Sequence, residues 1–170
     1  MSTCNPRLAN SLPLMTSRLA WFIATLGGSG HFPVAPGTVG SVVSAALAWF
    51  VIQATGAPTW TCGVAAVVFF YPAVWAAGKL EADSGEKDPG RVVVDEAIGQ
   101  WLTLTFARPD AVVDWVLAVA LFRIFDILKP PPIRSLEKIP GGLGVVADDA
   151  AAGACAMIIL AVARLAGLLA

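Results

Sequence analysis

The sequence predicts an all-α fold, a membrane-embedded bundle of about six helices, from its composition and from the spacing of its charges and chain breaks. Of its 170 residues, 57% are hydrophobic and 14% are charged, whereas soluble domains average about 45–50% and about 25%. No Asp, Glu, Lys or Arg occurs in the sixty residues from 19 to 78. Clusters of Pro and Gly divide the chain into apolar segments of helical length. A soluble bundle with an unusually apolar surface is the alternative.

Six apolar segments are the predicted helices, one short N-terminal helix and about five membrane spans. The short helix covers residues 16–26 and ends in a glycine run. Several of the longer segments fall below the roughly 20 residues that a straight span needs, but their charges lie at their ends. No repeat or linker occurs, so residues 1–170 are expected to form one domain. The predicted spans are 39–52, 60–78, 92–107, 111–128 and 148–169.

The basic residues predict the orientation of this bundle. With the N-terminus in the cytoplasm, Arg108 lies outside and Arg164 lies near the outer end of the last span. All other basic residues then lie on the cytoplasmic side, in agreement with the positive-inside rule. They are Arg7, Arg18, Lys79, Lys87, Arg91, Arg123, Lys129, Arg134 and Lys138.

Charge and cysteine content exclude two other classes of protein. The net charge is −1, so the chain lacks the basic face of a nucleic-acid-binding protein. Cys4, Cys62 and Cys155 are scattered and form no CxxC pair. They therefore predict neither a disulfide framework nor a zinc site.

Five carboxylates meet at the cytoplasmic end in this topology. Asp95 and Glu96 open one predicted helix, and Asp148 and Asp149 open the last one, where acids also complement the helix dipole and cap free N–H groups. Asp126 closes a helix, where the dipole disfavours negative charge. A cluster of carboxylates suits a hard cation such as Mg²⁺ with a phosphate beside it.

An ion pair with Arg123 or Lys129, three residues to either side, is the structural explanation for Asp126. Both basic residues, together with Arg134, are also candidates for contact with phosphate oxygens. Contact with anionic lipid is the alternative for Lys129 and Arg134.

A second candidate phosphate contact is the start of the second helix. Small residues there expose backbone N–H groups, which bind anions at helix N-termini; an ordinary capped helix is the alternative. These residues are Gly37, Thr38, Gly40 and Ser41. The acids between residues 79 and 91, Glu81, Asp83, Glu86 and Asp88, are expected to form a solvated loop.

Four blocks of the sequence carry a family resemblance. They read GSG at 28–30 with APGTVGS at 35–41, DEAIGQW at 95–101, FRIFDILKPPPIR at 122–134 and GGLGVVADDAAAG at 141–153. In this order they resemble the motifs of the phosphatidylglycerophosphatase A family. Pro131 and Ala147 depart from the family pattern, but neither departure removes a polar group.

The resemblance implies a Mg²⁺-dependent lipid phosphatase of the bacterial inner membrane. Such an enzyme hydrolyses phosphatidylglycerophosphate to phosphatidylglycerol and inorganic phosphate. The resemblance also implies an all-α bundle with one central helix. The expected partners are this substrate and membrane lipid, with no nucleic acid and no obligate protein partner.

We assign the five carboxylates to catalysis and to a pool of Mg²⁺ ligands, of which only some touch the metal. A remaining carboxylate would orient or deprotonate the attacking water, with an Asp nucleophile as the alternative. The pool is Asp95, Glu96, Asp126, Asp148 and Asp149; the substrate contacts are Gly37, Thr38, Ser41, Arg123, Lys129 and Arg134. His31 is the only histidine, so a mechanism that needs two is excluded.

Two functions of other classes are alternatives on the sequence. An ion-coupled transporter or channel would use the same carboxylates, since acids within a membrane also mark ion paths. It predicts acids at mid-span and a continuous pore, whereas here they gather at one end. A non-catalytic membrane scaffold predicts that substituting these acids leaves lipid composition unchanged.

Overall fold

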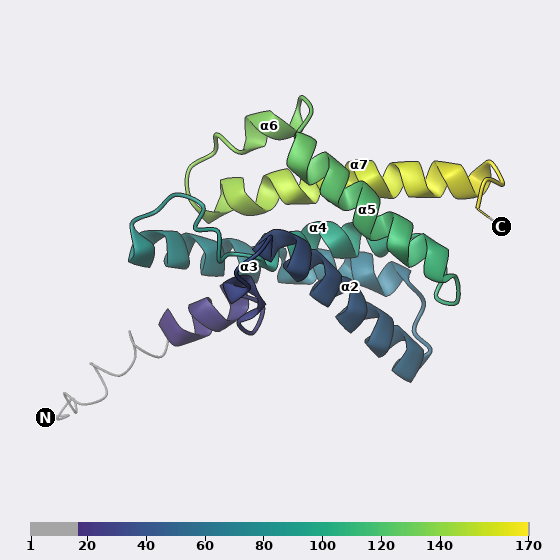
Figure 1. The fold of residues 1–170 in the computed structure, drawn as a ribbon, viewed down its shortest axis with the longest axis horizontal. Helices are drawn as coiled ribbons and strands as arrows, with labels where there is room; N and C mark the ends of the chain where they lie inside the picture. Colours follow the sequence, from purple (N-terminus) through teal and green to yellow (C-terminus); the bar gives the residue numbers. More distant parts are fainter. Residues whose placement is uncertain (1–16, 170) are drawn as a thin grey trace, which may run out of the picture.

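The computed structural model describes residues 17–169. This part of the chain consists of helices joined by turns and irregular segments, and it contains no strands. The first helix covers residues 17–24. The predicted starting residue Thr16, like Cys4 and Arg7, lies outside the described residues. The all-α prediction is confirmed (Figure 1). The remaining elements are η1 (Ser29–His31), α2 (Pro36–Thr55), α3 (Trp60–Ser84), α4 (Val94–Leu104), α5 (Val112–Leu128), α6 (Ile133–Leu136) and α7 (Gly142–Leu165).

Helix α4 is the central helix, and α2, α3, α5 and α7 all pack against it. Every residue from 92 to 100 is buried. Glycines allow α4 and α7 to meet closely, because a Cβ on Gly99 would strike the Asp149 carbonyl and one on Gly153 would strike the Gly99 backbone. Small residues permit such close contact between membrane helices. This contact brings the start of α4 beside the acids of α7.

Three helices, α2, α3 and α7, are long and apolar enough to cross a membrane. Large apolar side chains are exposed along them, including Phe50, Val67 and Ile158, as expected for surfaces that face lipid. Helix α4 has 11 residues, which rise about 16 Å against a hydrocarbon core of about 30 Å. The structure therefore supports a membrane protein with three helices suited to crossing the bilayer, and the five spans stay a prediction.

The predicted start of the last helix, at residue 148, was wrong. Helix α7 begins at Gly142, so Asp148 and Asp149 lie in its second turn and not at its opening. The glycine run that suggested a loop is a packing surface. A Cβ on Gly142 would strike the Val74 carbonyl, and one on Gly144 would strike the Ile139 carbonyl. First-turn capping therefore does not explain these two acids.

The end of α3 also differs from the prediction. The helix runs to Ser84, six residues beyond the apolar segment, and Lys79 forms an i,i+4 ion pair with Asp83 there at 2.6 Å. Such pairs support an exposed helix end, which is why part of the predicted polar loop is helical.

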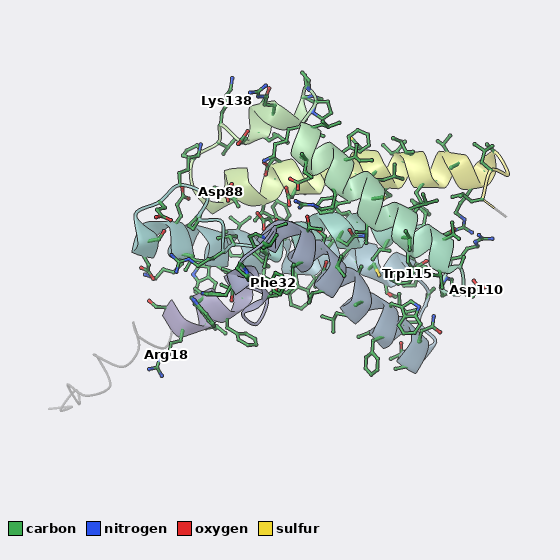
Figure 2. The ribbon with its side chains drawn as sticks, in the orientation of Figure 1. Arg18, Phe32, Asp88, Asp110, Trp115 and Lys138 are labelled. Carbon is green, nitrogen blue, oxygen red and sulfur yellow. The ribbon has the colours of Figure 1, made fainter. Side chains whose placement is uncertain are left out.

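Two groups of charged residues lie at opposite ends of helices α4 and α5. Arg108 and Arg164 both lie near Asp114, at 3.2 and 3.9 Å, which places them at the same end as the topology predicts. Asp110 and Trp115 mark this end in Figure 2, and Asp88 and Lys138 lie toward the other. The predicted carboxylate cluster lies where α2 and α4 begin and α5 finishes, at the opposite end of α4 and α5 from Asp114.

Candidate active site

A polar cavity of about 260 Å³ lies where the starts of α2 and α4 meet the end of α5 and the second turn of α7. Six carboxylates and two cationic side chains line it. The carboxylates are Asp88, Asp95, Glu96, Asp126, Asp148 and Asp149, and the cations are Arg123 and Lys129. The structure thus brings together all five predicted acids and two of the three predicted basic contacts.

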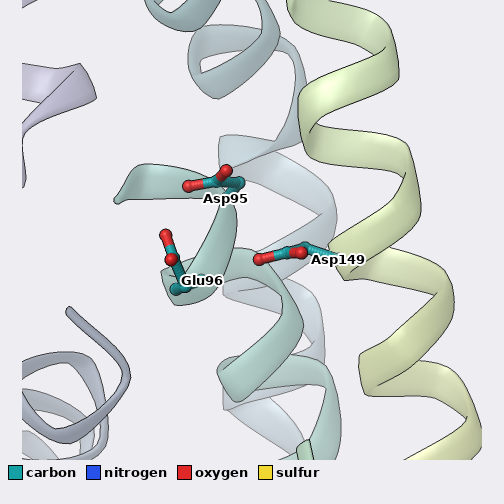
Figure 3. Close-up of side chains that lie close together, drawn as sticks. All are labelled: Asp95, Glu96 and Asp149. Carbon is teal, nitrogen blue, oxygen red and sulfur yellow. The ribbon is translucent and has the colours of Figure 1, made fainter. Parts of the chain in front are cut away.

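Three of these acids form a compact group. Asp95, Glu96 and Asp149 each place one carboxylate oxygen within 4.8 Å of the others. Figure 3 shows the first two on neighbouring positions of α4, with Asp149 reaching toward them from α7. All three side chains are buried. Among residues 17–169, Asp95 Oδ1 and Glu96 Oε2 have no hydrogen-bond partner.

This triad has the chemistry of a cation site. Ionised carboxylates so close to one another repel, and a buried oxygen without a donor is costly. A hard divalent cation resolves both problems because it binds oxygen ligands and supplies the missing positive charge. The residues present therefore fit a metal ion such as Mg²⁺.

The other two predicted acids are ion-paired. Arg123 lies 2.6 Å from Asp126 and 3.6 Å from Glu96, so the pairing expected one turn away on α5 is present. Lys129 lies 2.5 Å from Asp148 on α7. Arg123 thus adjoins the triad through Glu96. Both basic side chains line the cavity, and each pairs with an acid outside the triad.

Lys129 caps the end of α5 and stays cationic in this setting. Its backbone is left-handed, with φ of 41°. Burial opposes its charged form, but the hydrogen bond to Asp148 and the nearby charges of Asp149 and Glu137 outweigh that effect and raise the pKa of Lys129. A lysine that keeps its charge suits contact with a phosphate oxygen.

Helix α2 contributes its first turn to the cavity. Pro36 occupies the first helical position, where its missing N–H costs nothing. A Cβ on Gly37 would strike the Glu96 carboxylate and would lie 3.1 Å from Arg123 Nη1. Glycine at this position therefore lets the α2 backbone approach the charged groups.

The other predicted substrate contacts lie outside the cavity. Thr38 does not line it. Ser41 is fully buried, and its hydroxyl donates to the Gly37 carbonyl at 2.9 Å. A Cβ on Gly40 would strike Val93, which gives this glycine a packing role. Arg134 is exposed on α6.

Two polar residues near the site were missed by the sequence reasoning. Asp88, expected in a solvated loop, lines the cavity; only the tertiary approach of its loop to α7 shows this. Gln100 is fully buried, and its amide has no hydrogen-bond partner within the described part of the chain. Its position four residues after Glu96, on the same helix face, was a signal available in the sequence.

The comparisons with known proteins decide the family. The family model for phosphatidylglycerophosphatase A matches residues 22–164. The chain belongs to this family. The match includes every residue that lines the cavity. It confirms the resemblance drawn from the four sequence blocks and makes the protein a phosphatase rather than a transporter.

Curated relatives support the same assignment. Phosphatidylglycerophosphatase A of Escherichia coli is 35% identical over 136 residues, covering 78% of this chain and 77% of its own. Its namesake in Haemophilus influenzae is 38% identical over 135 residues, covering 78% and 81%. A Bacteroides thetaiotaomicron protein, provisionally named phosphatidylinositol-3-phosphatase, is 44% identical over 154 residues, covering 87% and 95%. No solved structure matches the chain.

Proposed function

We propose that this phosphatase is Mg²⁺-dependent and hydrolyses phosphatidylglycerophosphate to phosphatidylglycerol and inorganic phosphate. We place it in the bacterial inner membrane with the cavity on the cytoplasmic side. The observation that carries the proposal is the buried triad of Asp95, Glu96 and Asp149, two of whose oxygens lack a partner among residues 17–169. Family membership supplies the reaction class.

The triad would hold the cation, with Asp126 and Asp148 as the remaining acids of the pool. When bound, Mg²⁺ supplies charge neutralisation at the phosphoryl oxygens and activation of water. Arg123 and Lys129 bind phosphate oxygens, Arg123 through its planar fork and Lys129 as a point charge.

Asp126 is the carboxylate that we assign to the attacking water. It lines the cavity outside the triad, and its ion pair with Arg123 favours the ionised form, so it is placed to orient the water and accept its proton. The water oxygen forms the new bond to phosphorus as the bond from phosphorus to the oxygen of the glycerol headgroup breaks. Asp126 then releases the proton that it accepted to solvent, and the leaving oxygen takes up a proton from solvent. We favour water over an Asp nucleophile, and we assign Thr38, Ser41 and Arg134 no contact with the transferred phosphate.

A phosphoinositide is the second candidate substrate. The relative that is 44% identical carries a phosphatidylinositol-3-phosphatase name. Both lipids present a phosphomonoester on a polar headgroup, so the same cation and basic residues would serve either one. The two lipids differ in the headgroup that carries the phosphomonoester, which is a glycerol in the first and an inositol ring in the second.

Phosphate release from the purified full-length protein tests the proposal. Phosphatidylcholine vesicles would carry phosphatidylglycerophosphate or phosphatidylinositol 3-phosphate, with Mg²⁺ or a chelator. We expect release that requires Mg²⁺ and a kcat/KM that favours phosphatidylglycerophosphate. A preference for the phosphoinositide would transfer the activity to that substrate, and no release from either would refute the proposal.

A matched pair of variants tests the site in the same assay. Glu96→Gln removes a charge of the triad, and Glu86→Gln removes an exposed charge that does not line the cavity. Glu96→Gln should abolish release and Glu86→Gln should not. Equal activity in both variants would contradict the assignment.

Cysteine labelling tests the orientation. In a variant without native cysteines, Pro58→Cys and Pro109→Cys should react from the periplasmic side and Lys87→Cys only from the cytoplasm. All three positions are exposed. Labelling of 87 and 109 from one side would overturn the topology.

A further inference from the structure

A second, apolar hollow of about 640 Å³ lies between α2 and α5, apart from the polar cavity. Its walls include Val42, Ala46 and Trp49 of α2 and Val112, Val116 and Ala120 of α5. Every residue that lines it is apolar. We call it the α2–α5 groove. Figure 1 shows α2 starting and α5 ending near the middle of the view, with both helices extending from there to the right.

The groove continues the polar cavity along the same pair of helices. On α5, Ala120, Val116 and Val112 precede Arg123 by three, seven and eleven residues, which places them on the helix face that carries Arg123. On α2, Val42 follows Gly37 by five residues, a rise of about 8 Å. Gly37 and Arg123 both line the cavity.

Helices α2 and α5 also come close at this junction. A Cβ on Gly37 would lie 3.1 Å from Arg123 Nη1, whereas farther along the two helices leave the groove between them. Polar groups for a phosphate and an apolar channel for a chain therefore follow one another along one helix pair. This order is the order of groups in a phospholipid.

We propose that the α2–α5 groove binds one acyl chain of the lipid substrate while the phosphate lies in the cavity beside Arg123. The proposal rests on the proposed function, because that function supplies a substrate with a phosphate and an acyl chain. Lipid tails are as apolar as the groove, so moving a chain from the bilayer adds little affinity. The groove acts by position: a seated chain limits where the headgroup phosphate lies, and orientation strongly affects rate.

Filling the groove tests this role. Ala46→Phe places a ring in it, nine residues from Gly37 and outside the cavity. With long-chain phosphatidylglycerophosphate, we expect kcat/KM to fall about tenfold or more, as a misplaced substrate loses rate. With the deacylated headgroup, the variant and the wild type should be equal.

Ala54→Phe is the matched control. It makes the same change at an exposed position of α2 that does not line the groove. It should match the wild type on both substrates. The proposal is overturned if Ala46→Phe loses activity equally on both substrates, or if it matches Ala54→Phe on the long-chain lipid.

Photolabelling gives a readout that does not depend on turnover. The probe is phosphatidylglycerophosphate with a diazirine in the middle of one chain, in phosphatidylcholine nanodiscs. We expect labels on groove residues such as Val116 and Ala46, with competition by unlabelled substrate. Uncompeted labels, labels on other helices, or cross-linked protein dimers across the groove would overturn the proposal.

The two proposals fail in different ways. If the groove is labelled with competition but no phosphate is released from phosphatidylglycerophosphate, the proposed substrate is wrong and the acyl site stands. If phosphate is released and Ala46→Phe affects both substrates alike, the acyl site is wrong and the proposed function stands.

Discussion

Two clusters of charged residues lie at opposite ends of helices α4 and α5, and their charge balance differs. At one end, the single carboxylate of Asp114 is fully buried between Arg108 and Arg164. It accepts the Arg108 backbone N–H at 2.9 Å and two guanidinium N–H groups at 3.2 and 3.3 Å. At the other end, six carboxylates share a cavity with two cations.

The difference separates a structural cluster from a functional one. The Asp114 cluster has more positive than negative charge, and its acid is satisfied, as buried polar groups generally are. The cavity has an excess of negative charge and unpartnered oxygens on Asp95 and Glu96 within the described residues. Burial of charge alone therefore does not mark the site; burial with an unmet need for a cation does.

The largest expected effect comes from comparing the same substitution at two aspartates, one in each cluster. Asp149→Asn should lower kcat/KM about 10³-fold, in the range of lost electrostatic stabilisation in active sites, without lowering Tm, because the triad then repels itself less. Asp114→Asn should cost about 1–3 kcal/mol of unfolding free energy through its hydrogen bonds to charged groups, with activity per folded molecule retained. Tm and kcat/KM are measured on both. A large loss of activity in folded Asp114→Asn would remove the distinction between the two ends.

Metal binding should stabilise only the cavity end. At a Mg²⁺ concentration of about 100 times its Kd, the gain in unfolding free energy should be about 2.7 kcal/mol. Thermal unfolding of the purified protein measures it, with NaCl at equal ionic strength as the control. Asp114→Asn should keep this gain and Asp149→Asn should lose it. An equal gain in both variants would place the ion elsewhere.

Alanine substitutions at two glycines should give a smaller contrast between loss of activity and loss of stability. Gly37→Ala drives a Cβ into the Glu96 carboxylate, and Gly63→Ala drives one to 2.7 Å from Thr105 Oγ1, away from the cavity. We expect Gly37→Ala to lower kcat/KM about 10- to 100-fold by displacing charged groups. Gly63→Ala should cost about 1–3 kcal/mol of stability as an overpacked contact. Equal activity in the two variants would show that the α2 approach does not serve the site.

The smallest effect is expected at Thr38, which lies beside Gly37 but outside the cavity. Thr38→Val should change kcat/KM by no more than about threefold, because Thr38 makes no contact with the phosphate. Loss of a hydrogen bond to a charged group would instead cost about 1.5–3 kcal/mol, which lowers kcat/KM by more than about tenfold. Thr38→Ser is the control that retains the hydroxyl. A tenfold loss in Thr38→Val that Thr38→Ser does not share would bring Thr38 back into contact with phosphate.

Much of this arrangement was predictable from the sequence because it depends on local patterns. An uncharged stretch of sixty residues implies a membrane, and helical segments between Pro and Gly clusters imply the bundle. Successive helices run in opposite directions, so the sequence predicts that Asp95, Asp126 and Asp149 lie at the same end of the bundle. Asp126 at a helix C-terminus was anomalous on dipole grounds, and it lines the cavity.

Only tertiary contacts determine which of the five acids form ion pairs and which belong to the triad. Spacing along the chain does not distinguish Asp148 from its neighbour Asp149, yet Lys129 pairs with the first and the second faces Asp95 and Glu96. That choice follows from the rotation of α7 against α4, which the contact of Gly153 with Gly99 sets.

The sequence by itself determined the helical class, the membrane setting and the end of the bundle at which the acids gather, since hydrophobicity and helix direction are local properties. Only the tertiary structure decided which carboxylates remain without partners, how Asp88 enters the cavity and where the α2–α5 groove lies. These features depend on distances between residues far apart in the chain. Such distances are set by side-chain packing across helices, which no single segment encodes.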